Sequence, residues 1–298
     1  LCLLGARLSK HESGYFQIDS LLQGANWNRE LRSPLTEIGV AATKGEFITS
    51  VNEKSTRNVP DINALLINKS DKNVELTLNS VPAEGGRKVL VVPINDESKL
   101  YYYTWVQNNI RKVDKATNGE VGYIHIPDMS AEGLNEFVKH FYPQLAKKAL
   151  IIDDRGNGGG NVSPMLIERL NREIQRNNIA RNVEIIGHTP TKMMLGPKVL
   201  LINNYSASDG DLFPYGFKKQ QLGKVIGTRT WGGVVGIRGS LPFIDGADLR
   251  KPEFASFAAD ESKWIIEGYG VEPDIEIDND PAREYDGVDD QLNKAIEV

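Results

Sequence analysis

The sequence predicts an α/β protein in which a small β-rich domain precedes a larger domain built on a mostly parallel sheet. From about residue 96, short apolar runs alternate with amphipathic helical patterns, which is typical of parallel strands covered by helices. Before that point, short alternating segments separated by glycine-containing turns dominate. A chain of 298 residues is long enough for two domains. We therefore expect domains at 1–93 and 94–298.

The elements of the first domain follow from local patterns. Alternation of apolar and polar residues predicts strands at 14–19, 47–52, 74–78 and 88–93. The stretch 59–68 predicts a short helix, since Pro60 suits a first helical turn and Ile62, Leu65 and Leu66 follow at helical spacing. These elements indicate a compact β module with one small helix.

The second domain reads as strands and helices in turn. Apolar runs predict strands at 121–127, 149–153, 198–202 and 223–227. Helical spacing predicts helices at 100–114, 131–145 and 164–178, and another after Ser208. The acidic stretch 278–290 predicts a surface loop before a last helical turn. The domain is therefore expected to carry its functional loops at the carboxyl ends of the strands.

Composition narrows the class of protein. Hydrophobic residues make up 40% and charged residues 25%, as in a globular protein, and the net charge of −5 without a basic stripe argues against a nucleic-acid partner. No apolar run is long enough to span a bilayer, so no membrane partner is expected. Cys2 is the single cysteine, which excludes an internal disulfide and favours a cytoplasmic location, with the periplasm as the alternative. The apolar start without a methionine suggests a piece of a longer protein.

Two loops that follow apolar strands carry the residues of chemical interest. The first reads DDRGNGGGN at 153–161, and the second is NNYSASDGDLFPYGF at 203–217. Taken alone, Ser208 with Asp211 would be a helix cap, and Ser206 a turn residue. Glycines let a loop turn its amides toward a neighbouring group, and an oxyanion hole needs two such donors. We therefore expect Gly158 and Gly159 to provide one donor and the Asp209 amide the other.

The sequence gives less support to other functions of the glycine loop. The run lacks the last glycine of a dinucleotide fingerprint, and no Gly-Lys-Ser/Thr follows for a phosphate loop. A metal could be held by Asp153, Asp154, Asp209 and Asp211, but adjacent aspartates on a strand point to opposite faces. We expect neither a metal nor another cofactor.

The first domain resembles a PDZ domain. The likeness rests on SPLTEIGVAATKGEFITSVNEKS at 33–55, which contains a glycine-punctuated turn followed by a strand. The resemblance implies that a peptide adds to the sheet as a strand, with its terminal carboxylate held by the loop containing Leu4, Gly5 and Ala6. A β module that serves only as a spacer is the alternative.

The second domain resembles the tail-specific, or C-terminal processing, serine peptidases, and within them the tricorn branch. Further motifs that carry the likeness are GYIHIPDM at 122–129, GTRTWGGVVGI at 227–237 and WIIEGYGVEPDIEIDNDPA at 264–282. The resemblance implies a crotonase-like α/β core with Ser208 as the nucleophile. The processing peptidases activate this serine with a lysine, but Gly233 occupies that position here. The tricorn branch uses a histidine instead, supported by a glutamate that matches Glu267.

The chain has four histidines, and none matches the base of the tricorn branch. His125 lies in a predicted strand, His140 in a predicted helix and His188 in a loop, while His11 lies already inside the PDZ-like domain. We therefore expect the base to precede Leu1.

The resemblance implies a serine endopeptidase that hydrolyses oligopeptides through an acyl-enzyme on Ser208, with peptide substrates as partners. It also implies a homo-oligomeric full-length parent, and feeble activity for these 298 residues alone. A catalytically inert, PDZ-containing scaffold that binds peptides is the alternative.

Overall fold

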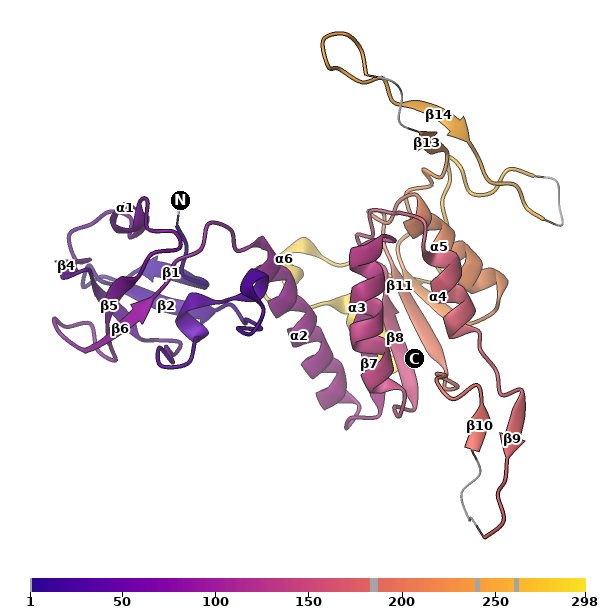
Figure 1. Cartoon of the computed structure of the whole chain (residues 1–298), viewed down its shortest axis with the longest axis horizontal. Helices are drawn as coiled ribbons and strands as arrows, with labels where there is room; N and C mark the ends of the chain where they lie inside the picture. Colours follow the sequence, from indigo (N-terminus) through magenta and orange to yellow (C-terminus); the bar gives the residue numbers. More distant parts are fainter. Residues whose placement is uncertain (1, 183–186, 239–241, 260–262) are drawn as a thin grey trace. The chain divides into compact units, whose positions relative to one another are not determined.

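A computed structural model describes residues 2–182, 187–238, 242–259 and 263–298 (Figure 1). The chain forms two compact units, Leu1–Asn108 and Asn109–Val298. Helix α2 (Ser98–Ala116) continues through the point at which the units divide. The boundary expected at 93/94 stays a prediction, because α2 belongs partly to each unit.

The first unit is built on an antiparallel sheet. Its strands are β1 (Ala6–Lys10), β2 (Phe16–Leu21), β3 (Phe47–Val51), β4 (Lys54–Ser55), β5 (Val74–Asn79) and β6 (Arg87–Val91). They run in the order β1-β2-β3-β5-β6, with β4 paired to β3. The helical elements are short: η1 (Arg29–Leu31), η2 (Pro34–Thr36) and α1 (Asn63–Leu66). Ile18, Ile48, Leu76 and Leu66 are among the buried side chains that hold α1 against the sheet.

The second unit contains a parallel sheet in the order β15-β12-β11-β8-β7. The strands are β7 (Val121–His125), β8 (Ala149–Asp153), β11 (Lys198–Ile202), β12 (Gly223–Gly227) and β15 (Ile275–Glu276). Most of their residues are buried, as expected for parallel strands covered on both faces. Because β8 and β11 are parallel neighbours, the loops that follow them leave the sheet side by side.

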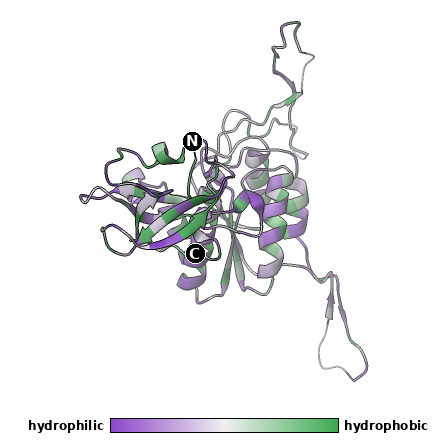
Figure 2. Ribbon diagram, turned by 60° about the vertical axis from the view of Figure 1, so that its left-hand side comes forward, coloured by the Kyte–Doolittle hydropathy of each residue, from purple (hydrophilic) through white to green (hydrophobic). Residues whose placement is uncertain are grey.

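Helices cover the parallel sheet. On one face lie α3 (Ala131–Phe141), which η3 (Tyr142–Gln144) extends, α4 (Ser163–Leu170) and α5 (Asp209–Lys219), whose apolar residues share one core with the strands (Figure 1). A second core on the sheet joins Val113 of α2 and Leu292 of α7 (Asp290–Glu297). A short helix, α6 (Pro281–Tyr285), precedes α7. Figure 2 shows both hydrophobic and hydrophilic residues on the helices beside the sheet, as expected for helices with one buried side.

The predicted helix at 164–178 is wrong in its second half. Helix α4 ends at Leu170, and the stretch from Arg176 forms β9 (Arg176–Asn178), which pairs with β10 (Gly187–Thr189). After Leu170 the sequence NREIQRNN offers one apolar residue, Ile174, so a longer helix would have no buried face. A second hairpin is formed by β13 (Gly236–Arg238) and β14 (Lys251–Phe254).

Among the described residues, no helix combines the length and apolarity needed to cross a membrane.

Candidate active site

Ser208 lies at the turn between β11 and helix α5. Its backbone has φ +59° and ψ −120°, a conformation that L-residues rarely adopt, and its side chain is exposed. The hydroxyl does not cap the helix, and the structure records no hydrogen bond from it to a described residue. The capping role that the sequence suggested is therefore wrong. A strained turn that presents an unbonded hydroxyl at a helix N-terminus is the local geometry of a nucleophile.

The neighbouring polar side chains have structural partners. Ser206 is buried, and its hydroxyl donates to the Asp154 carbonyl at 2.7 Å. Asp209 accepts hydrogen bonds from the backbone N–H of Ser163 at 2.9 Å and from the Ser163 hydroxyl. The Asp209 carboxylate therefore ties the start of α4 to the start of α5. It is not available as a base for Ser208.

The glycine loop lies directly against Ser208. A Cβ placed on Gly159 would lie 2.6 Å from the Ser208 Cβ and 2.8 Å from the Ala207 carbonyl oxygen. The Ala207 N–H donates to the Asn157 carbonyl at 2.9 Å, which joins the two loops. The structure thus brings together Ser208, Gly159 and Asp209, as the parallel order of β8 and β11 predicts. Only a residue without a side chain fits at position 159.

The amides of the glycine loop are engaged in this conformation. The Gly159 N–H donates to Asn157 Oδ1 at 2.9 Å, and the Gly158 N–H donates to the Pro127 carbonyl at 3.3 Å. No acceptor among the described residues is recorded for the Asp209 N–H, which lies at the first position of α5. The oxyanion role of Gly158 and Gly159 therefore stays a prediction, and it requires these amides to exchange their partners.

Two buried aspartates precede the glycines, and their pKa values shift in opposite directions. The Arg155 guanidinium contacts Asp153 at 2.6 Å and Asp289 at 2.9 Å. Burial alone would raise the pKa of Asp153, but Arg155 and the Tyr123 hydroxyl lower it below its usual value. For Asp154, burial and the nearby charge of Asp153 raise the pKa well above its usual range. Asp153 thus anchors the loop through its ion pair with Arg155, whereas the surroundings of Asp154 favour its neutral form.

Glu267 lies in a turn that contacts the 232–235 turn. One carboxylate oxygen of Glu267, Oε2, accepts the N–H groups of Val234 and Val235 at 2.7 and 2.8 Å. Asp211, three residues after Ser208, holds the same turn by accepting the N–H groups of Gly232 at 2.7 Å and Gly233 at 3.2 Å. Asp211 and Glu267 therefore fix the 232–235 turn from two sides. No direct contact between Glu267 and Ser208 is recorded among the described residues.

Comparison with known proteins agrees with this geometry. Residues 120–277 match peptidase family S41, and residues 2–96 match the tricorn protease PDZ domain. The chain belongs to peptidase family S41. The tricorn and tail-specific resemblance is confirmed, and so is the α/β fold class with a PDZ-like region first.

Relatives of this S41 chain are similar along its whole length. It is 36% identical to tricorn protease homolog 1 of Streptomyces coelicolor, over 99% of the chain and 27% of that protein. It is 37% identical to the tricorn protease of Thermoplasma acidophilum, over 97% of the chain and 27% of that protein. A crystal structure of the tricorn protease superposes with a TM-score of 0.88 at 34% identity, over 99% of this chain and 28% of that chain. The S41 chain thus spans about a quarter of the length of these relatives.

The four histidines of the S41 chain all have other surroundings. His125 is buried with Nε2 3.1 Å from the Arg155 carbonyl, and burial lowers its pKa. His140 lies 3.3 Å from Glu136, His11 Nδ1 contacts the Ser13 hydroxyl, and His188 lies on the β9–β10 hairpin. None of these recorded contacts involves Ser208. A base for Ser208 is therefore not found among the described histidines.

The loop predicted to bind a peptide carboxylate lies at the start of β1. Its Gly5 N–H donates to Glu97 Oε1 of the same S41 chain at 2.7 Å. The sequence does predict a carboxylate partner for Leu4, Gly5 and Ala6, but it gave no sign that the chain itself supplies one. Peptide binding by this loop stays a prediction.

Sequence reasoning missed three residues that shape the S41 site, Asn157, Asp154 and Asp211, and it missed the role of Glu97 in the first unit. An asparagine within a glycine run is a turn signal, so Asn157 could have been found. Asp154 was considered only as a metal ligand, and Asp211 only as a metal ligand or as part of a helix cap, because the amides that Asp211 binds and the burial of Asp154 depend on the fold. Their roles depend on contacts that no local pattern records.

Proposed function

We propose that the chain carries the nucleophile of a serine peptidase that hydrolyses oligopeptides through an acyl-enzyme on Ser208. The observation that carries the proposal is the left-handed backbone of Ser208 at a strand-to-helix turn, with its exposed hydroxyl beside Gly159. Membership of family S41 supports peptide hydrolysis as the reaction class.

The residues around Ser208 take defined roles in this proposal. The Ser208 hydroxyl attacks the peptide carbonyl, and the proton passes to a base before it reaches the leaving amine. The Asp209 amide, at the positive end of α5, donates to the oxyanion. The Gly158–Gly159 turn supplies the second donor once its amides leave Pro127 and Asn157. Hydrolysis of the acyl-enzyme by water then restores the serine.

The base comes from outside residues 1–298 in this proposal. All four histidines of the chain contact other groups, and the related tricorn proteins are several times longer than this chain. Glu267 supports the base through its second carboxylate oxygen, since Oε2 is bound by Val234 and Val235. We also infer that the full-length parent is a homo-oligomer that acts on peptides. Its elution volume in size-exclusion chromatography tests the oligomeric state.

An inert scaffold is the second candidate, and the engaged amides of Gly158 and Gly159 favour it. Labelling by a fluorophosphonate distinguishes the two functions. The full-length parent should be labelled on Ser208, and Ser208→Ala should abolish the label. Ser206→Ala is the matched control and should keep the label, because the Ser206 hydroxyl is buried. An assembled, folded parent that takes no label would establish the scaffold instead.

The location of the base has its own test. The 298-residue chain should turn over peptides feebly, whereas the full-length parent should be active. Rapid hydrolysis by the chain alone would show that one of its own groups activates Ser208, and His188→Ala and His11→Ala would then identify it.

A further inference from the structure

The loop at the start of β1 already holds a carboxylate. The Gly5 N–H donates to Glu97 Oε1 at 2.7 Å, and Glu97 is only 8% exposed. Burial raises the pKa of Glu97, while hydrogen bonds from the amides of Gly5, Ala6 and Leu4 act in the opposite direction. The Leu4–Ala6 loop therefore faces one buried acidic group and donates the Gly5 amide to it, as in an anion-binding concavity. The ligand in this concavity belongs to the same chain.

The loop is built to keep this shape. Gly5 has φ +75°, which favours glycine, and a Cβ there would collide with Ser33. Ser33 is itself buried, and its hydroxyl donates to the Leu22 carbonyl at 2.7 Å. The amides are thus pre-arranged by the surrounding packing rather than by Glu97 alone.

A cavity of about 150 Å³ continues from Glu97 and is lined by apolar and polar residues, with Asp61 and Asn63 among the polar ones. Leu4, Ala6 and Leu8 on the β1 side and Ile62 and Leu66 on the α1 side are among its lining residues. Strand β1 is an edge of its sheet and pairs with β2 alone among the described strands. An extended peptide could therefore pair with β1 and place an apolar last residue in the cavity. Its terminal carboxylate would then meet the position of Glu97.

We propose that Glu97 is the resident carboxylate ligand of the Leu4–Ala6 loop and keeps the terminal carboxylate of a peptide out of it. A tethered group competes at an effective concentration on the order of millimolar, so it excludes weak ligands without binding tightly. The unit in its observed state is closed to peptide C-termini, and it opens when Glu97 leaves the loop. This inference does not depend on the role of Ser208.

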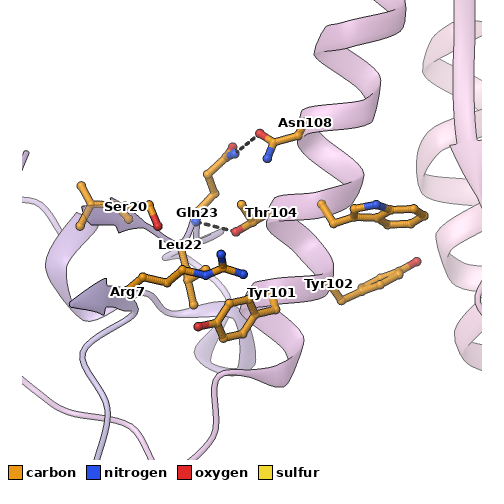
Figure 3. A pocket seen from close by; sticks show the side chains of 10 residues that line it. Arg7, Ser20, Leu22, Gln23, Tyr101, Tyr102, Thr104 and Asn108 are labelled. Atoms are coloured by element: carbon orange, nitrogen blue, oxygen red, sulfur yellow. Dashed lines mark hydrogen bonds between the residues drawn. The ribbon is translucent and has the colours of Figure 1, made fainter. Parts of the chain in front are cut away.

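Removing Glu97 leaves helix α2 attached to the sheet. The Gln23 N–H donates to the Thr104 hydroxyl at 2.8 Å, and Gln23 Nε2 donates to Asn108 Oδ1 at 3.1 Å (Figure 3). The Arg7 guanidinium also lies over the Tyr101 ring, 5.4 Å from its centroid. These contacts surround a second cavity of about 620 Å³ and do not involve Glu97. A Glu97→Ala variant is therefore expected to fold.

The first test uses acetate as a probe. In the 298-residue chain, Glu97→Ala should lose thermal stability, and acetate should restore part of it because acetate binds only the folded loop. Sodium chloride at the same ionic strength should not restore it. Wild type and the control Glu84→Ala, whose carboxylate is exposed, should not respond to acetate beyond the chloride effect. A folded Glu97→Ala variant without an acetate response would overturn the proposal.

The second test uses peptides that end in an apolar residue, with a free or an amidated C-terminus. Glu97→Ala should bind the free acids at least about tenfold more tightly than wild type, as expected when an internal competitor is removed. The amidated peptides should gain nothing. If wild type binds the free acids as tightly as the variant, Glu97 does not close the loop.

A third variant covers a failure of Glu97→Ala to fold. Glu97→Asp is one methylene shorter, so its carboxylate should withdraw from the Gly5 amide while the charge remains. It should shift the Gly5 amide resonance and gain affinity for the free acids in the same direction. An Asp variant that binds peptides no better than wild type would contradict the proposal.

Discussion

A methyl group at position 159 is a direct probe of the contact between the two loops. Gly159 has φ +88°, and a Cβ built there lies 2.6 Å from the Ser208 Cβ and 3.1 Å from the Asp209 N. The first separation is shorter than real Cβ atoms show and the second is tight, so an added methyl group would displace Ser208 and press on Asp209, two of the residues expected to form the site. Gly159→Ala therefore tests whether this contact positions Ser208.

The loss of stability expected for Gly159→Ala has two parts, and alanine variants of two nearby glycines distinguish them. A left-handed backbone costs an L-residue about 1–2 kcal/mol, and overpacking adds about 1–3 kcal/mol. Gly159→Ala should therefore lose about 2–5 kcal/mol. Gly156 has φ +73° with nothing within 4 Å of its Cβ, so Gly156→Ala should lose only the first part. Gly158 has neither feature, and Gly158→Ala should be neutral or gain about 0.4–1 kcal/mol.

Calorimetry on the three variants measures these differences. In a unit of this size, 1 kcal/mol shifts Tm by about 2–4 °C, so Gly159→Ala should lower Tm by at least about 4 °C. Fluorophosphonate labelling of Ser208 in the full-length parent should slow by about 100-fold for Gly159→Ala, as expected for a misplacement near 1 Å. Equal stability and equal labelling of Gly159→Ala and Gly158→Ala would refute the contact.

Three further predictions concern single residues of the site. Ser208→Gly should raise Tm and increase the free energy of unfolding by up to about 1 kcal/mol, because glycine relieves the strain at φ +59° and the serine hydroxyl makes no recorded bond. A Tm below that of Ser208→Ala would contradict this. Asp154→Asn should be more stable than wild type at pH 7, because a raised pKa gives stability that is present below the unfolded value near 4 and lost as pH rises through the folded value. Thermal melts from pH 4 to pH 8 should show the two proteins converging at the acidic end, and a difference independent of pH would be inconsistent with a neutral Asp154. Asp211→Asn should cost about 1.5–3 kcal/mol, because it removes the charge that accepts the Gly232 and Gly233 amides, and hydrogen exchange at these amides should accelerate. Unchanged exchange would show that Asp211 does not hold the turn.

The strands of the second unit could be read from the sequence because burial leaves a local record. The runs 149–153, 198–202 and 223–227 are continuous apolar stretches, and β8, β11 and β12 have these bounds. The error at 164–178 has the opposite cause. There the sequence carries weak helical spacing, but beyond Leu170 no neighbouring element offers a surface on which a helix could pack.

Some features of the candidate site could likewise be predicted from the sequence, and others could not. The two loops could be named because each follows an apolar strand and parallel strands bring such loops to one edge, whereas Ser208 was named as the nucleophile from the resemblance to the tricorn branch. The raised pKa of Asp154 could not be predicted from the sequence, since it depends on burial and on the charges of Asp153, Asp211 and Asp209.

The sequence by itself determined the order of the two architectures, the family and the pair of loops that contain Ser208 and Gly159, because periodicity, glycine content and motif order are properties of neighbouring residues. The tertiary structure alone decided which amides and carboxylates already have a hydrogen-bond partner within the chain. It placed Glu97 on Gly5 across 92 positions and Asp209 on Ser163 across 46 positions. A hydrogen bond between distant residues depends on where the fold brings them and on the absence of competing water, and neither is written in the local pattern.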